Sequence, residues 1–138
     1  MAMIDGTVRV LVAEDDEEIR QTLRLIVEDG GYEVLEARDG IAALDVLRAS
    51  QAPLVVLLDL MMPRLDGAGV LQAIFNDATM RGRHECIVVT AGNRTLPLNT
   101  AQLISKLSAS ILPKPFEMDD LLKAVDEAAQ RLRERGGP

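Results

Sequence analysis

The chain is poor in side chains that carry sulfur, aromatic and imidazole chemistry. Its 138 residues include one cysteine, one histidine and no tryptophan, and aromatic residues make up only 2% of it. A single cysteine, Cys86, cannot build a disulfide framework within the chain, so we expect a reducing, cytoplasmic setting. We expect Cys86 to be a small buried hydrophobic residue in an aliphatic core, because aromatic side chains are too few to fill one.

Positive charge is also scarce. Lysine and arginine number 15 against 22 aspartates and glutamates, which gives a net charge of −7. Proteins bind nucleic acid and anionic membrane surfaces mainly through Lys and Arg, so the sequence disfavours direct contact with either. We find no signal peptide pattern and no apolar run long enough to span a bilayer. Protein partners and cations fit this charge better.

What the sequence does have is 48% apolar residues in a regular arrangement. Short runs rich in β-branched residues alternate with stretches of helical period, which predicts βαβ units and a parallel sheet. We expect one α/β domain over residues 1–138, doubly wound, with five strands in the flavodoxin-like order 2-1-3-4-5 between two layers of helices. Its core would run from about 8 to 132, and 133–138 would form a frayed tail. The expected strands are 8–13, 32–37, 54–60, 86–90 and 110–112, and the expected helices are 16–29, 40–49, 67–76, a short one from 99 or 100, and 117–135.

Several residues have ordinary structural interpretations. Ile19 and Ile41 belong to the apolar stripes of the first two expected helices, so we expect them to be buried. The only histidine, His84, and the basic cluster Arg81–Arg83 lie in a polar stretch before the fourth strand. We expect both to be solvated parts of a loop.

Polar side chains stand at the ends of the expected strands. The first strand runs into Glu14, Asp15 and Asp16, and the third contains Asp59 in an otherwise apolar run. In an open α/β sheet, ligands bind at the carboxyl ends of the strands, so we expect these carboxylates to converge. Clustered carboxylates must hold protons or share a cation. Mg²⁺ suits a site with few carboxylates, because it keeps several waters and accepts phosphate oxygens.

A phosphoryl group would fit beside such an ion. The carboxylate of Asp59 is the candidate nucleophile, since carboxylates can form aspartyl phosphates. The fourth strand ends at Thr90, whose hydroxyl could donate to phosphoryl oxygens, and the fifth runs into Lys114, whose ammonium could pair with them. Alone, an acidic pair could simply begin a helix, and a threonine or a lysine could be an ordinary surface residue. Their joint placement favours the functional interpretation.

Four motifs carry a resemblance to a known family. They are EDDEE after the first strand, DLMMPRLDG around Asp59, Thr90-Ala91 after the fourth strand and Lys114-Pro115-Phe116 after the fifth. In this order, over roughly residues 8 to 132, they resemble the receiver domain of two-component response regulators, the CheY-like superfamily. The resemblance implies phosphorylation of Asp59 by a histidine kinase or histidine phosphotransfer protein, in a signalling protein rather than an enzyme. A downstream partner is implied but not identified.

The resemblance also implies roles for individual residues. Thr90 matches the switch hydroxyl, and Lys114 matches the lysine that contacts the phosphoryl group. The bond between Lys114 and Pro115 resembles one that is cis in this family. The implied ion is Mg²⁺, for which Mn²⁺ can substitute, and its implied ligands are Asp15, Asp16, Asp59 and the backbone carbonyl of Met61.

Three departures from the family lie near its expected switch. Ile111 occupies the position, three before Lys114, where the family commonly has Tyr or Phe. Residues 108–110 replace a Gly-Ala type turn, and Asn93–Thr100 contains a proline where a charged helix start is expected. A β-branched aliphatic residue has restricted rotamers and no ring to move inward, so we predict an atypical switch.

Three alternatives stay open on the sequence. A receiver-like interaction module that works without phosphorylation would keep the fold, and Ile111 is compatible with it. A flavin-binding module would need a Gly-, Ser- or Thr-rich loop after the first strand, where this chain has Glu14–Glu18. A phosphatase of the haloacid-dehalogenase type would need a second aspartate two residues after Asp59, where this chain has Met61.

Overall fold

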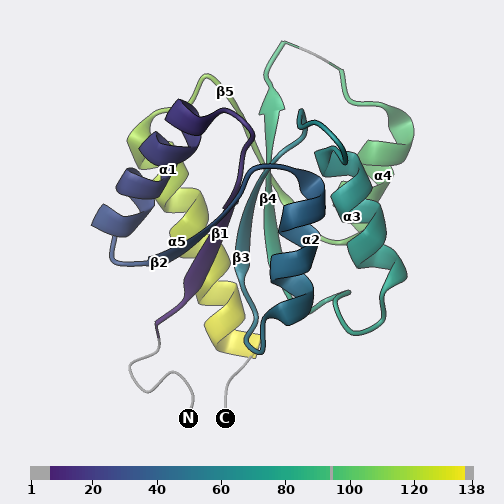
Figure 1. The fold of residues 1–138 in the computed structure, drawn as a ribbon, viewed down its shortest axis with the longest axis horizontal. Coiled ribbons are helices and arrows are strands. Elements are labelled where there is room, and N and C mark those ends of the chain that lie inside the picture. The colour runs from purple at the N-terminus through teal and green to yellow at the C-terminus, as the bar shows by residue number, and fades with distance from the viewer. Residues whose placement is uncertain (1–6, 94, 136–138) are drawn as a thin grey trace.

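Strands and helices alternate along the described part of the chain (Figure 1). The structure, a computed structural model, describes residues 7–93 and 95–135. Most boundaries lie within a residue or two of those expected, because the apolar runs and glycine stops that mark them are local signals. The elements are β1 (Arg9–Ala13), α1 (Glu17–Asp29), β2 (Glu33–Ala37), α2 (Gly40–Ala49), β3 (Val55–Asp59), α3 (Gly67–Asn76), β4 (Glu85–Ala91), α4 (Leu98–Lys106), β5 (Ser110–Lys114) and α5 (Met118–Arg135).

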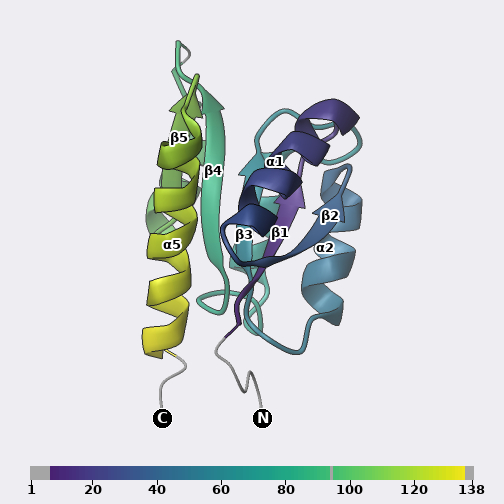
Figure 2. The same cartoon turned by 90° about the vertical axis from the view of Figure 1, so that its left-hand side faces the viewer.

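The five strands form one parallel sheet in the order β2-β1-β3-β4-β5, which confirms the expected doubly wound fold. Helices α1 and α5 pack on one face, and α2, α3 and α4 pack on the other (Figure 1; Figure 2). Right-handed crossovers between parallel strands produce this three-layer arrangement. All strands therefore end at the same edge of the sheet, where the polar residues singled out above are found.

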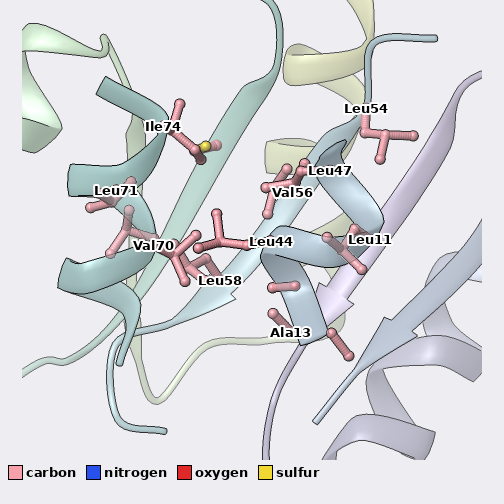
Figure 3. Close-up of a cluster of buried hydrophobic side chains, with 14 of the residues drawn as sticks. Leu11, Ala13, Leu44, Leu47, Leu54, Val56, Leu58, Val70, Leu71 and Ile74 are labelled. Atoms are coloured by element: carbon pink, nitrogen blue, oxygen red, sulfur yellow. The ribbon is translucent and has the colours of Figure 1, made fainter. Parts of the chain in front are cut away.

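The position of β3 at the centre of the sheet explains its unbroken apolar sequence. All five of its residues are buried, because helices cover both faces of a parallel sheet. Val56 and Leu58 point into the cluster formed with α2, α3 and α4, where they lie among Leu44 and Leu71 (Figure 3). Val55 and Leu57 belong to the opposite cluster with α1 and α5. The core is almost entirely aliphatic, and Cys86 is buried within it as expected.

Three burial expectations were wrong. Ile19 and Ile41 are both exposed, although each belongs to an apolar stripe. Each lies in the first turn of its helix, and Ile19 borders an open groove at the strand ends. His84 is buried rather than solvated, because its Nδ1 accepts a hydrogen bond from the backbone N–H of Leu54 at 3.0 Å.

The segment before β5 forms a regular helix. Helix α4 begins after Pro97, which acts as the N-cap without a side-chain hydrogen bond. Neither Asn99 nor Thr100 caps it; the Asn99 side chain accepts from the Thr100 N–H inside the first turn. Leu103 and Ile104 are buried as expected.

The carboxyl-terminal helix extends beyond the expected core. Residues 133–135 continue α5, whereas residues 136–138 of the expected tail lie outside the described residues. In the described part of the chain, none of the helices has the length and apolar character needed to cross a membrane.

Candidate functional site

The strand register places the predicted site residues close together. Ala13 of β1 pairs with Leu58 of β3. The residues that follow them in the chain, Glu14 and Asp59, therefore lie level with each other. On the other side Asp59 pairs with Val89, which leaves Thr90 one residue further along β4. Register alone thus places an acidic residue on one side of Asp59 and a hydroxyl on the other.

The end of β4 lies beside the end of β5. Thr90 pairs with Pro113, and Ala91 pairs with Lys114. The lysine side chain reaches back across β4, so that its Nζ lies 3.8 Å from Asp59 Oδ2. The Lys114-Pro115 peptide bond is cis, as the resemblance implied.

Three carboxylates form a compact acidic group. One oxygen each from Glu14, Asp15 and Asp59 lies within 4.8 Å of the others. Asp59 is 6% exposed and Glu14 is 3% exposed, whereas Asp15 is open to solvent. Burial, and then the neighbouring Asp59 carboxylate, raise the pKa of Glu14 to about 7. Such a set of hard oxygen donors, held together against its own repulsion, fits a divalent cation such as Mg²⁺.

Asp16, which we expected to be a metal ligand, lies outside this acidic group. Its Oδ1 accepts a hydrogen bond from the Ile19 N–H at 3.0 Å, which makes Asp16 the N-cap of α1. Its own N–H donates to Glu14 Oε2 at 3.0 Å. Asp16 is therefore absent from the acidic group, and Glu14 takes the place we had expected for it.

The sequence contained a signal for Glu14 that the motif comparison missed. Glu14 is the first residue after β1, and it is nearer than Asp16 to the strand end that faces Asp59. The distance of each residue from the end of β1 favours Glu14 and Asp15 as the acidic neighbours of Asp59, whereas the two aspartates of EDDEE suggested Asp15 and Asp16.

The loop after Asp59 is fixed at both ends. The Met61 N–H donates to Asp59 Oδ1 at 3.1 Å, while the Met61 side chain is exposed. Further along, the Gly40 N–H at the start of α2 donates to the Leu65 carbonyl at 3.0 Å. A Cβ on Gly40 would lie 2.1 Å from that carbonyl oxygen, so the close approach requires glycine. The loop is thereby docked on α2.

An open groove of about 930 Å³ lies beside Lys114. It gives an approach to the strand ends from solvent, next to the acidic group. Its lining is mainly apolar and is formed by Ile19, Ala91, Gly92, Asn93, Pro113, Lys114, Pro115 and Phe116.

Thr90 and Ile111 differ in exposure. Thr90 is buried at the end of β4. Ile111 pairs with Val88 and is 49% exposed, so it lies on the surface of β5 rather than under it. A side chain at this position is therefore accessible to a partner.

Comparison with known proteins identifies the family. A family model described as the response regulator receiver domain matches residues 10–126. Curated relatives include response regulator MprA of Mycobacterium sp. (strain KMS), which is 35% identical over 137 residues, covering 95% of this chain and 54% of the relative. MprA of Mycobacterium tuberculosis (strain ATCC 25618 / H37Rv) is 35% identical over 133 residues, covering 92% and 53% respectively. The chain thus spans about half the length of these relatives.

Solved structures agree with this assignment. A CheY-like receiver domain protein from Methanospirillum hungatei JF-1 is 27% identical, with a TM-score of 0.80 over 91% of this chain and 97% of the other. A receiver domain protein from Clostridium thermocellum is 28% identical, with a TM-score of 0.78 over 93% and 98%. The strand order, the acidic strand ends and these matches together show that the chain belongs to the response regulator receiver domain family of two-component systems.

Proposed function

We propose that this domain accepts a phosphoryl group on Asp59 from a histidine kinase or histidine phosphotransfer protein, in a Mg²⁺-dependent reaction in the cytoplasm. The observation that carries the proposal is the position of Asp59. Its buried carboxylate has two further carboxylates on one side and the Lys114 ammonium at 3.8 Å on the other. A carboxylate held beside an ammonium suits a nucleophile for a phosphoryl group, and an open groove lies on the Lys114 side of the site.

The transfer itself needs few protein groups. A carboxylate oxygen of Asp59 attacks phosphorus and forms an O–P bond, while the N–P bond of the donor phosphohistidine breaks. The departing imidazole keeps the electron pair and takes a proton from solvent. Lys114 would pair with a phosphoryl oxygen, and the hydroxyl of Thr90 would donate to another. These residues bind and orient the group, so the domain is a phosphoacceptor rather than a turnover enzyme.

The proposed ligands of the ion are Asp59, Asp15 and Glu14, with the backbone carbonyl of Met61. Glu14 replaces Asp16 of the sequence-based set, because the Asp16 carboxylate caps α1. When bound, Mg²⁺, or Mn²⁺ in its place, would offset the negative charge that otherwise repels a phosphoryl group.

Phosphorylation would then bias a partner-binding surface. The acyl phosphate carries roughly −1.5 to −2 charges, in place of the single negative charge of the Asp59 carboxylate. We propose that the response is atypical around β5, where Ile111 is already half exposed and has no ring to turn inward. The downstream partner would be a protein or an output domain, without direct contact between this domain and nucleic acid or membrane.

The test is intact mass after incubation with acetyl phosphate, with and without Mg²⁺. The expected result is a gain of one phosphoryl group that requires Mg²⁺ and is lost in Asp59→Asn. Asp45→Asn, which removes an exposed aspartate of α2, serves as the matched control and should be phosphorylated normally. If neither acetyl phosphate nor a phosphorylated histidine phosphotransfer protein labels Asp59, the phosphoacceptor function is wrong and the phosphorylation-independent interaction module is favoured.

A further inference from the structure

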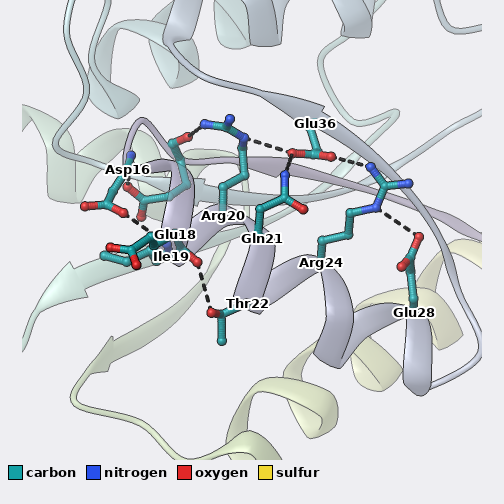
Figure 4. A network of polar contacts seen from close by, with 10 residues as sticks. Asp16, Glu18, Ile19, Arg20, Gln21, Thr22, Arg24, Glu28 and Glu36 are labelled. Atoms are coloured by element: carbon teal, nitrogen blue, oxygen red, sulfur yellow. Dashed lines mark hydrogen bonds and ion pairs between the residues drawn. The ribbon is translucent and has the colours of Figure 1, made fainter.

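An arginine next to the acidic group connects it to the edge of the sheet. Arg20, on the second turn of α1, donates through Nε to Glu36 Oε1 at 2.9 Å (Figure 4). Through Nη1 it donates to the backbone carbonyl of Glu14, also at 2.9 Å. The Arg20 side chain is only 12% exposed, so both hydrogen bonds are sheltered from solvent.

These contacts fix the backbone of Glu14 on both sides. Its N–H donates to the Ala37 carbonyl at 3.0 Å, and its carbonyl accepts from Arg20. Glu14 lies just beyond the end of β1, where its bond to Ala37 of β2 still joins it to the sheet. The Asp16 N–H donates to the Glu14 carboxylate at 3.0 Å, so that bond and the two backbone bonds together set the direction of the carboxylate toward the other two carboxylates of the acidic group.

Glu36 holds the Arg20 side chain in place through a network of hydrogen bonds. It sits in β2 and accepts from three side chains of α1: Arg20, Gln21 at 3.1 Å, and Arg24 (Figure 4). Burial acts to raise the pKa of Glu36, but the hydrogen bonds from Arg24 and Arg20 hold it below its usual range. Glu36 thus stays charged, and it keeps the Arg20 guanidinium in one orientation.

We propose that Arg20 is a positioning residue for the metal site, holding the Glu14 backbone so that the Glu14 carboxylate joins those of Asp15 and Asp59. This inference rests on the proposed function, because it concerns the ion that phosphorylation would require. Residues behind the ligands of a metal site commonly change metal affinity by about 10- to 100-fold when they are removed. Arg20 would act in this way without touching the ion.

Arg24 provides a matched control. It lies one turn further along the same helix and donates to the same glutamate, Glu36, as well as to Glu28. Within the described part of the chain it makes no hydrogen bond to Glu14. Replacing Arg24 removes the same charge and disturbs the same network, but it leaves the Glu14 carbonyl bonded to Arg20.

The sign of the effect separates positioning from simple electrostatics. Arg20 is a cation close to a cation site, so removal of its charge alone would tighten binding of a divalent ion. Loss of positioning would weaken it. The two explanations therefore predict opposite shifts in the dissociation constant.

The experiment is a titration of the unphosphorylated protein with Mn²⁺, followed by the electron paramagnetic resonance signal of the free ion. We expect Arg20→Ala to weaken binding about 10-fold. Arg20→Lys, which keeps the charge but cannot make both bonds, should recover only part of the affinity. Arg24→Ala should bind as the wild type does, and urea unfolding would verify that all variants are folded. Equal or tighter binding by Arg20→Ala, or an equal loss in Arg24→Ala, would overturn the inference.

A second measurement needs no metal. The carbonyl carbon resonance of Glu14 should shift in metal-free Arg20→Ala and stay in place in Arg24→Ala, because only Arg20 donates to that oxygen. No shift in Arg20→Ala would mean that the contact is not made in solution. If the wild type itself takes up no Mn²⁺ and no Mg²⁺, the metal-dependent function fails and the positioning role falls with it. Loss of the proposed function is thereby distinguished from loss of this inference alone.

Discussion

The Lys114 ammonium lies 3.8 Å from the Asp59 carboxylate, although their strands are separated by β4. The lysine side chain is 42% exposed, whereas the Asp59 side chain is only 8% exposed. An ammonium held beside a buried carboxylate is well placed to pair with a phosphoryl oxygen transferred to that carboxylate. We expect Lys114→Ala to slow phosphorylation by acetyl phosphate about 10-fold or more, because a charge that stabilises the transferred group is lost. Stability should fall by on the order of 1 kcal/mol, because the buried Asp59 carboxylate loses a half-exposed cationic partner.

Intact mass as a function of time gives the rate, and urea unfolding gives the stability. Lys123→Ala, on the exposed face of α5, is the matched control and should be phosphorylated at the wild-type rate. Unchanged phosphorylation of Lys114→Ala would remove the lysine from the proposed chemistry.

The loop that follows Asp59 should depend on Gly40. A Cβ at this position would lie 2.1 Å from the Leu65 carbonyl oxygen, which cannot move as a flexible side chain could. We expect Gly40→Ala to destabilise the protein by about 2 to 3 kcal/mol and to weaken Mg²⁺ binding, because the loop carrying Met61 must shift. Gly82→Ala is the comparison: its Cβ would meet open space, so only its φ of +79° carries a cost, of about 1 to 2 kcal/mol. Similar losses from both substitutions in urea unfolding would contradict the docking of the loop.

The fold was predictable because its signals are local. The unbroken apolar run of β3 identified the central strand, and glycine stops and apolar stripes marked most helix ends. Asp59, Thr90 and Lys114 were singled out because each lies at the end of a strand, and those strand ends can be read directly from the sequence. The handedness of parallel connections then placed helices on both faces, and the order 2-1-3-4-5 is a common one for such doubly wound sheets.

What the sequence missed depends on contacts between distant segments. His84 is buried because it accepts from Leu54, 30 residues away, and nothing in the polar stretch around it marks that partner. Glu14 rather than Asp16 joins the acidic group because register and helix capping separate neighbours in the chain. The bond from Arg20 to Glu36 requires the rotation of α1 over β2, which no periodicity fixes to one residue.

Repulsion among the carboxylates of the acidic group should lower the stability of the metal-free protein by a measurable amount. Asp59 helps to raise the pKa of Glu14 in the metal-free protein. We expect Asp59→Asn to raise the free energy of unfolding without Mg²⁺ by on the order of 1 kcal/mol, because the Asp59 charge that repels its neighbouring carboxylates is lost. Mg²⁺ at about 100 times its dissociation constant should stabilise the wild type by about 2.7 kcal/mol, and the variant by much less. Thermal unfolding with Mg²⁺ or with a chelator tests both, and a Mg²⁺ increment equal in the two proteins would contradict the ligand role of Asp59.

His84 should make the protein sensitive to acid far from the acidic group. Burial, together with the charges of Arg83 and Arg135, lowers the pKa of His84 from 6.5 to about 4. Between these two values the unfolded chain binds a proton at this position and the folded chain does not, so stability falls as the pH drops from 6.5 toward 4. Protonation would also remove the lone pair of Nδ1 that accepts from Leu54. His84→Asn keeps an acceptor but cannot titrate, so urea unfolding should show the wild type losing about 2 to 3 kcal/mol more than the variant over this window. Parallel stability profiles for the two proteins would mean that the imidazole is not held in its buried, neutral form.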